Sequence, residues 1–142
     1  MLSAVEKVLF LMRAPVTSDA STDALARLAS VAHEVEVALG QRLFTLGDQS
    51  DAVWVVLDGA VRIEGIEVPS RLAGPGDFIG GLALFSDGAQ AATAVTAVTT
   101  RLLRIDRADL HDLLDEDGEF ARALFSGLMR TLRLTAPSLF AA

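Results

Sequence analysis

The sequence contains no cysteine, which excludes disulfides, thiolate metal sites and a cysteine nucleophile. Only two histidines are present, His33 and His111, and two imidazoles far apart in the chain are too few for a zinc site. No apolar run is long enough to cross a bilayer, and residues 8–12, the most apolar early stretch, lack the features of a signal peptide. We therefore expect no metal site and a cytoplasmic location.

Positive charge is also scarce. The chain has 12 Lys and Arg against 19 Asp and Glu, which gives a formal net charge of −7. Such an acidic chain is poorly suited to holding a phosphate backbone or an anionic membrane surface by itself. We therefore expect no nucleic-acid partner and no membrane insertion.

Catalytic patterns are missing as well, because no nucleophile–base pair or paired carboxylate set stands out. Four aspartates fall close to helical spacing, and a solvated helix face explains them: Asp109, Asp112, Asp115 and Asp117. The expectation is that the protein is not an enzyme and has no catalytic residues.

A length of 142 residues with 51% hydrophobic residues fits one domain with its own core. No internal repeat, low-complexity tract or long linker divides the chain. We expect a single domain over residues 1–142, with helices over 1–33, a β-rich region over 34–105 and helices over 106–134.

The first helices are marked by their caps. Ser3 with Glu6 is a capping-box pattern ahead of an apolar run and predicts a helix over 3–12. Ser21 or Thr22 can cap a second helix. The predicted buried face of that helix consists of Leu25, Leu28, Ala29 and Ala32.

Helical periodicity returns near the C-terminus. Asp106 predicts a helix over about 106–115, ended by Gly118, and a last helix follows over about 120–134. The last helix is apolar over more than one face, with two neighbouring stripes, Phe120, Leu124, Leu128 and Thr131, and Ala121, Phe125, Leu128 and Leu132. Two interpretations remain open: contact with a partner, as a homodimer or in a parent protein, or wide burial against the N-terminal helices. We expect three arginines on its solvated side to neutralise the acidic residues 115–119: Arg122, Arg130 and Arg133.

Between these helices the apolar period changes to two, which predicts short strands. The expected strands cover residues 34–37, 42–45, 52–57, 60–64, 66–68, 93–98 and 101–105. Asp58-Gly59 predicts a hairpin, because glycine tolerates the positive φ that such turns require. Glycine turns at this spacing are typical of a small barrel or sandwich.

The densest glycine cluster covers residues 74–85 and reads GPGDFIGGLALF. A turn that leads into Gly80-Gly81 and four apolar residues can direct the free N–H groups of a short helix toward an anion. A glycine-rich turn between strands explains the same pattern. The sequence has neither the Lys-Ser/Thr pair of a nucleoside-triphosphate loop nor the spacing of a dinucleotide fingerprint.

Three segments resemble the cyclic-nucleotide-binding domain family of catabolite-activator-type regulators, kinase regulatory subunits and gated channels. Residues 47–61, GDQSDAVWVVLDGAV, resemble its hairpin with an aromatic strand. Residues 74–80, GPGDFIG, resemble its Gly-Pro-Gly-Asp turn, and residues 80–93 resemble its phosphate-binding cassette. The resemblance extends over about 24–134 and implies a mainly β fold, an eight-stranded jelly-roll barrel with flanking helices.

The same resemblance implies a ligand site in the cassette and cAMP or cGMP as its ligand. The candidate residues are Gly80, Gly81, Leu82, Ala83, Gln90, Ala91 and Ala92. In the family a glutamate accepts a hydrogen bond from the ribose 2′-hydroxyl and an arginine pairs with the cyclic phosphate. Those positions align with Gly81 and Gln90, or Ala91 after a one-residue shift. A charge-assisted hydrogen bond contributes about 1.5–3 kcal/mol, so losing both lowers affinity by about 10²–10⁴.

Two functions follow from these departures. The first is a non-catalytic regulatory or sensor module with weak or lost cAMP and cGMP binding, which acts through protein contacts of the last helix. The alternative is a working sensor of a cyclic nucleotide or another nucleotide-like ligand, which uses the backbone anion site at 80–83. Residues 135–142 are too few for a helix-turn-helix module, so we expect a free-standing domain or one excised from a longer chain.

Overall fold

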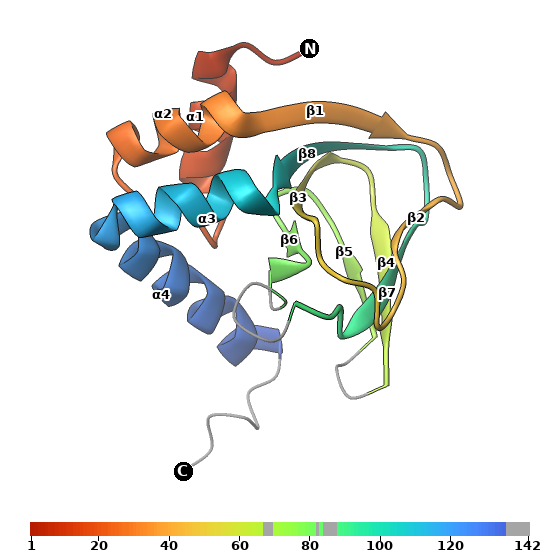
Figure 1. Cartoon of the computed structure of the whole chain (residues 1–142). Helices are drawn as coiled ribbons and strands as arrows, with labels where there is room; N and C mark the ends of the chain where they lie inside the picture. The colour runs from red at the N-terminus through yellow and green to blue at the C-terminus, as the bar shows by residue number, and fades with distance from the viewer. Residues whose placement is uncertain (67–69, 82, 84–87, 136–142) are drawn as a thin grey trace. The chain divides into compact units, whose positions relative to one another are not determined.

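The computed structural model describes residues 1–66, 70–81, 83 and 88–135 (Figure 1). The chain divides into two compact units. One contains residues 1–31 together with those from 109 onward, and the other contains residues 32–108. The prediction of a single domain stays a prediction, and each unit is described by itself below.

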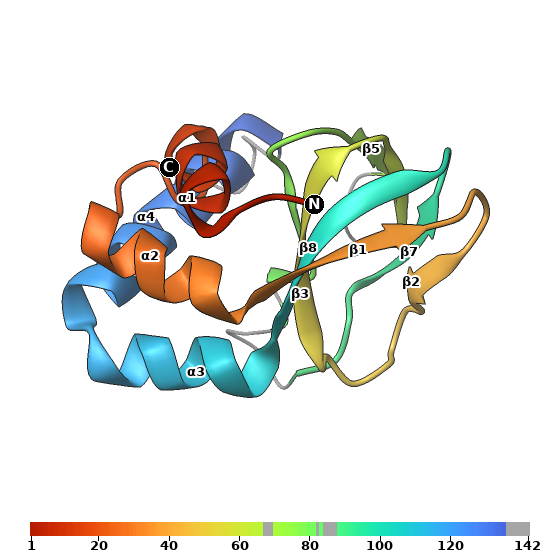
Figure 2. The ribbon, with the colours of Figure 1, turned by 90° about the horizontal axis from the view of Figure 1, so that it is seen from above.

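The first unit begins with two helices, each of which starts directly after a capping residue predicted from the sequence. In α1 (Ala4–Arg13) the Ser3 hydroxyl accepts a hydrogen bond from Glu6 N at 3.1 Å. The Glu6 carboxylate accepts one from Ser3 N at 3.0 Å, and this hydrogen bond lowers the pKa of Glu6. In α2 (Thr22–Val31) Ser21 is the cap, because its hydroxyl accepts from Ala24 N at 3.1 Å. Both predicted helices are confirmed, except that Ala32, expected on the second helix, lies just beyond its end. α1 and α2 lie side by side (Figure 2).

The last two helices, α3 (Arg107–Glu116) and α4 (Gly118–Thr135), are separated by Asp117. The Asp117 carboxylate accepts a hydrogen bond from Phe120 N at 3.1 Å. That bond is the main cause that lowers the pKa of Asp117, and the ion pair with Arg27 of α2 lowers it further. Gly118, expected to end a helix, is therefore the first residue of the next one.

One stripe of α4 is buried as expected, whereas the other is not. Phe120, Leu124 and Leu128 lie in the core, but Phe125 is 49% exposed. The expected neutralisation of the acidic run 115–119 by α4 is wrong for Arg130. Its guanidinium instead pairs with Asp19 and donates to the Pro15 carbonyl at 3.2 Å. Folding brings the 15–19 segment next to α4, which no local pattern shows.

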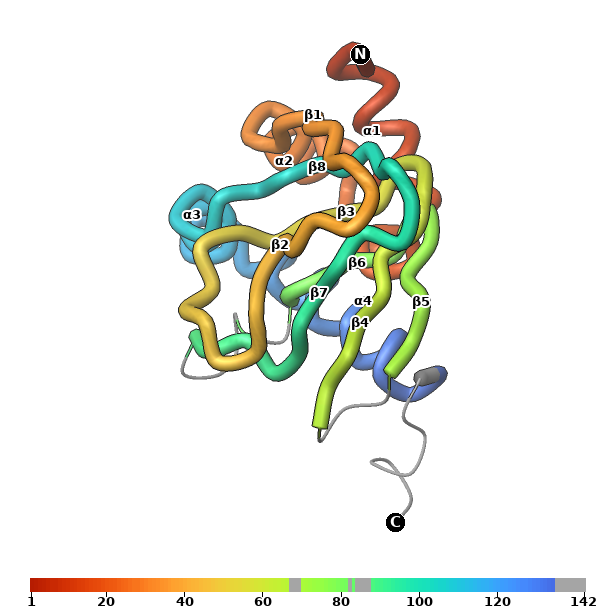
Figure 3. The backbone as a smooth tube through the Cα atoms, turned by 90° about the vertical axis from the view of Figure 1, so that its right-hand side faces the viewer, coloured from red at the N-terminus to blue at the C-terminus, as the bar shows by residue number. Residues whose placement is uncertain are grey.

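The second unit contains two antiparallel sheets (Figure 3). The first has the order β1 (Ala32–Val37), β8 (Thr100–Asp106), β3 (Ala52–Asp58) and β6 (Phe78–Ile79). The second has the order β2 (Arg42–Phe44), β7 (Ala92–Thr96), β4 (Val61–Gly65) and β5 (Arg71–Ala73). No strand ladder among the described residues joins the two sheets, so the closed eight-stranded barrel stays a prediction.

A shared core lies between the sheets, because alternate residues of each strand point to the same side. β3 contributes Ala52, Trp54 and Val56, and β4 contributes Val61 and Ile63. The mainly β fold with flanking helices is thus confirmed. β5 and β6, of three and two residues, were not predicted from the sequence, and most of the expected strand 66–68 lies outside the described residues.

The predicted hairpin at Asp58-Gly59 is wrong. β3 pairs with β6 and β8, whereas β4 pairs with β5 and β7, so this turn carries the chain from one sheet to the other. Gly59 does adopt a positive φ of 117°. The predicted positive φ at Gly59 is confirmed, but the composition of a turn does not show whether the strands on either side pair with each other.

Candidate ligand-binding site

Gly80 directly follows β6 and has the positive φ, 86°, that glycine accommodates without strain. Atoms of three other residues lie close to the Gly80 backbone. A Cβ atom at this position would lie 3.3 Å from the Gln90 Nε2 and 3.5 Å from both the Ala52 carbonyl oxygen and a ring carbon of Phe44. Gly80 and Gln90, both predicted from the cassette pattern, are therefore neighbours in the structure.

The Gln90 backbone is held by two hydrogen bonds with the turn at residues 47–48. Gln90 N donates to the Asp48 carbonyl, and Gly47 N donates to the Gln90 carbonyl, both at 2.8 Å. The residue as a whole is only 5% exposed. A neutral side chain thus occupies the position where the family resemblance places a guanidinium.

The remaining candidates are placed differently from one another. Gly81 and Ala83 are buried, Ala91 is exposed, and Ala92 belongs to the core between the sheets. Leu82 lies outside the described residues. Burial of Ala92 in the core agrees with a packing role, while the roles of the other candidates in binding remain predictions.

Two polar residues near the cassette were missed by the sequence analysis. Gly88, with φ 91°, lies so close to Arg107 that a Cβ atom there would be 2.5 Å from the Arg107 Nη1. The Arg107 Nη1 also donates to the Ser50 carbonyl at 3.3 Å, and Ser50 N donates to the Gly88 carbonyl at 2.6 Å. The Ser50 hydroxyl is buried and forms no hydrogen bond with any residue that the structure describes. A guanidinium and a buried hydroxyl therefore lie beside Gly88, within the 80–93 segment.

No signal in the sequence could have revealed this cluster. Arg107 comes directly after β8, and its backbone N donates to the Asp51 carbonyl at 3.0 Å, which anchors it beside the start of β3. The pairing of β3 with β8 brings the two segments together. Proximity of this kind depends on strand pairing over long sequence distances.

Two further properties bear on chemistry. No group of three or more His, Asp or Glu side chains in the described part of the chain could hold a metal ion. Among the same residues, none of the helices is both long and apolar enough to traverse a membrane.

A family model described as the cyclic nucleotide-binding domain matches residues 34–117. The N-terminal domain of a transcriptional regulator from Streptomyces coelicolor is 30% identical, with 92% of this chain and 94% of that one covered and a TM-score of 0.70. The catabolite activator protein of Thermus thermophilus is 27% identical, with 88% and 61% covered and a TM-score of 0.71.

A regulatory subunit of a cAMP-independent protein kinase A from Trypanosoma brucei is 19% identical, with 92% of this chain and 48% of that one covered and a TM-score of 0.75, which shows a common fold. No curated protein matches the sequence. The matched strands and cassette lie inside the 34–117 segment, which accounts for more than half of the chain. The chain therefore belongs to the cyclic nucleotide-binding domain family, whose members are regulatory, non-catalytic modules.

Proposed function

We propose that this protein is a cytoplasmic, non-catalytic regulatory module in which cAMP and cGMP binding is weak or lost. One observation carries the proposal. The two charged cassette positions hold Gly81 and Gln90, and the Gln90 side chain is buried beside Gly80. In this proposal the two sheets form the family's eight-stranded jelly roll.

The expected loss of affinity for cAMP and cGMP follows from the loss of two charged groups. The NH₂ group of an amide can donate hydrogen bonds to a phosphate oxygen, but it lacks the positive charge and the parallel donor fork of a guanidinium. Replacement of both charged groups lowers affinity by about 10²–10⁴ if each contributes about 1.5–3 kcal/mol. The fold also occurs in the regulatory subunit of a protein kinase A that is described as cAMP-independent, so the fold by itself does not require cAMP.

We propose that the output passes through protein contacts of the terminal helices, either with a second copy of the chain or within a parent protein. The supporting observation is exposed apolar surface. Phe125 on α4 is 49% exposed, and Val5 and Leu9, one helical turn apart on α1, are 68% and 51% exposed. The adjacent pair on α1 forms an exposed apolar patch, and such patches are typical of protein contacts.

Isothermal titration calorimetry with cAMP and cGMP tests the loss of binding. We expect the unmodified protein to show no micromolar binding, and Gly81→Glu with Gln90→Arg to raise affinity about 100-fold by restoring both charges. The control is Ser70→Arg with Gly74→Glu, which adds the same charges outside the cassette, where a Cβ at Gly74 meets open space.

Micromolar binding by the unmodified protein would contradict the proposal. If the double variant gains no affinity while circular dichroism shows that it is folded, the shape of the pocket has also changed, and missing charges are not the sole cause.

The alternative function is a working sensor of a nucleotide-like ligand, and the cluster of Arg107 and Ser50 specifically favours it. A buried hydroxyl without a hydrogen bond is costly unless something bonds to it, and Arg107 supplies a positive charge that Gln90 lacks.

Calorimetry with cyclic dinucleotides and cAMP tests this alternative. If the unmodified protein binds one of these ligands, we expect Arg107→Gln to weaken that binding at least tenfold, because a charge-assisted contact with phosphate is removed. The matched control is Arg62→Gln, an exposed arginine paired with Glu64 on β4. Equal affinity of the Arg107→Gln variant and the control would exclude a role for this cluster.

A further inference from the structure

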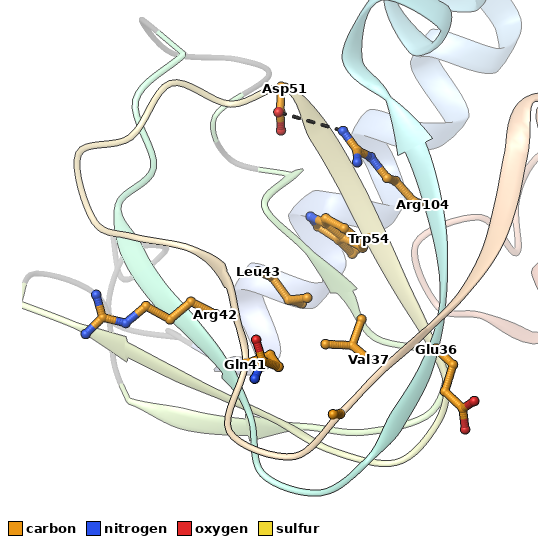
Figure 4. Close-up of a pocket in the computed structure, with 9 residues that line it drawn as sticks. Glu36, Val37, Gln41, Arg42, Leu43, Asp51, Trp54 and Arg104 are labelled. Atoms are coloured by element: carbon orange, nitrogen blue, oxygen red, sulfur yellow. Dashed lines mark ion pairs between the residues drawn. The ribbon is translucent and has the colours of Figure 1, made fainter.

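A cleft of about 410 Å³ opens in the strand unit (Figure 4), and the residues that line it do not include the cassette candidates. It is lined by the end of β1, the β1–β2 connection and β2 on one side, and by β3 and β8 on the other. β1 and β2 are edge strands of their respective sheets, so the cleft is the open side of the space between the sheets. Its volume is within the range of about 300–1,000 Å³ for small-molecule pockets.

One wall of this cleft is apolar. Val37, Leu43 and Trp54 all point into the same space, whereas Glu36 and Arg42 point away from it (Figure 4). Alternation along the strands explains the division, since neighbouring residues face opposite sides of a sheet. Trp54 is 9% exposed and belongs to the core, which gives the cleft a fixed aromatic surface.

Next to the apolar wall lie opposite charges. Arg104 is directly opposite Trp54 in the β3–β8 register, with its guanidinium carbon 5.3 Å from the centre of the indole ring. The Arg104 Nη2 is 3.7 Å from the Asp51 Oδ2, longer than a hydrogen bond, and the Asp51 side chain is 85% exposed. The Arg104 Nε is 3.3 Å from the Asp106 Oδ1, yet it is buried and forms no hydrogen bond within the described part of the chain.

These contacts leave hydrogen-bonding capacity at Arg104 and at Asp51. An exposed ion pair at this distance contributes little net free energy, so a ligand can separate it at small cost. A carboxylate accepts two parallel hydrogen bonds from a guanidinium, and an ammonium group donates to a carboxylate. Arg104 and Asp51 therefore offer adjoining sites for a negative and a positive group.

We propose that this cleft binds a hydrophobic α-amino acid as its zwitterion. The ligand carboxylate contacts Arg104, its ammonium group contacts Asp51, and its side chain packs on Val37, Leu43 and Trp54. A simple carboxylic acid fits less well because Asp51 and Asp106 both lie near Arg104 and would repel it. A simple amine fits less well because it would lie beside the guanidinium without a compensating charge. The site uses none of the cassette candidates, although Asp51 lies between Ser50 and Ala52, which contact the cassette, and the proposal does not depend on the proposed function.

Trp54 gives a direct signal for the test, because it is the only tryptophan and the chain contains no tyrosine. Leucine is titrated into the full chain, with fluorescence of Trp54 and calorimetry as independent readouts. Two matched analogues each lack one charge: 4-methylpentanoate has no ammonium group, and 3-methylbutylamine has no carboxylate. We expect saturable binding of leucine and at least tenfold weaker binding of both analogues, because each loses one charged contact.

Substitutions of Arg104 and Asp51 then test which residue contacts each charged group of leucine. Arg104→Gln and Asp51→Asn should each weaken leucine binding about tenfold or more, whereas Asp51→Asn should leave 4-methylpentanoate binding equal or stronger. The control is Arg101→Gln, also on β8, whose side chain is 43% exposed compared with 37% for Arg104 and is paired with Glu34 outside the cleft. Asp51 is so exposed that its substitution should not disturb folding, which keeps the test valid if Arg104→Gln unfolds the protein.

The proposal is overturned if leucine produces no saturable change in either readout. It is also overturned if both analogues bind as well as leucine, or if Asp51→Asn binds leucine as tightly as the unmodified protein.

Discussion

Gly127→Ala is expected to lower the free energy of unfolding by about 3 kcal/mol or more, although alanine is the better helix former. Gly127 lies in the middle of α4, where glycine normally costs stability. A Cβ atom at this position would lie only 2.0 Å from the Val16 carbonyl oxygen and 2.6 Å from the Val16 carbonyl carbon. The helix and the backbone of Val16 would have to move apart.

The segment around Val16 has little freedom to make this adjustment. Ala14, Val16 and Thr17 are at most 2% exposed, and Thr17 donates its hydroxyl hydrogen bond to the Leu11 carbonyl. Arg130, one turn along α4, also donates to the Pro15 carbonyl. Separation of the two elements would break these contacts, and interiors packed this tightly tolerate an added methyl group poorly.

Urea denaturation followed by circular dichroism measures the effect. Gly118→Ala is the matched control, since it lies in the same helix with no atom within 4 Å of its Cβ position. We expect that control to leave stability unchanged within about 0.5 kcal/mol or to raise it slightly. Equal stability of the two variants would show that α4 and Val16 are not in close contact in solution.

The second large effect is expected at the turn between the sheets, where Gly59→Ala should cost roughly 3–5 kcal/mol. Two causes add here. The φ of 117° is one that residues with a side chain rarely adopt, and a Cβ atom would lie 2.6 Å from the Thr100 Oγ1 and 2.8 Å from its Cα. Thr100 cannot yield easily, because it is fully buried and its hydroxyl donates to the Val98 carbonyl at 2.8 Å and accepts from Ala60 N at 3.3 Å.

Gly47→Ala separates these two causes. Gly47 has a similar positive φ, 88°, but its Cβ position has no atom within 4 Å. Thermal or urea unfolding of this control should show only the conformational cost, about 1–2 kcal/mol. If Gly59→Ala is no less stable than Gly47→Ala, the close approach of Thr100 makes no contribution, and the assignment of this corner is wrong.

Local patterns predicted those parts of the fold that depend on neighbouring residues. The capping box of Ser3 and Glu6 forms as expected because both hydrogen bonds span only three residues. The strands were located because burial of one sheet face imposes a period of two on the sequence, as in β4. Family motifs extended this to the mainly β fold and to Gly80 and Gln90, which do lie together.

Pairing of distant segments could not be predicted in the same way. Asp58-Gly59 has the composition of a hairpin, yet β3 and β4 belong to different sheets. Likewise, Arg107 reaches Gly88 and Ser50 only because β8 pairs with β3. The residues of a turn restrict the φ and ψ angles of that turn only. Which strands pair depends on how both sheets pack over one core.

By itself, the sequence determined that this protein is mainly β and belongs to the cyclic nucleotide-binding domain family, that it contains no cysteine, and that Gly81 and Gln90 stand where the resemblance places the two charged cassette residues. Only the tertiary structure decided which side chains lie near these positions and in the cleft: a buried Gln90 beside Gly80, Arg107 beside Gly88, and Arg104 over the Trp54 ring. The physical reason is range. Capping and burial patterns depend on residues that are close together in the sequence. Electrostatic partners, in contrast, are brought together by the pairing of strands that are far apart in the chain.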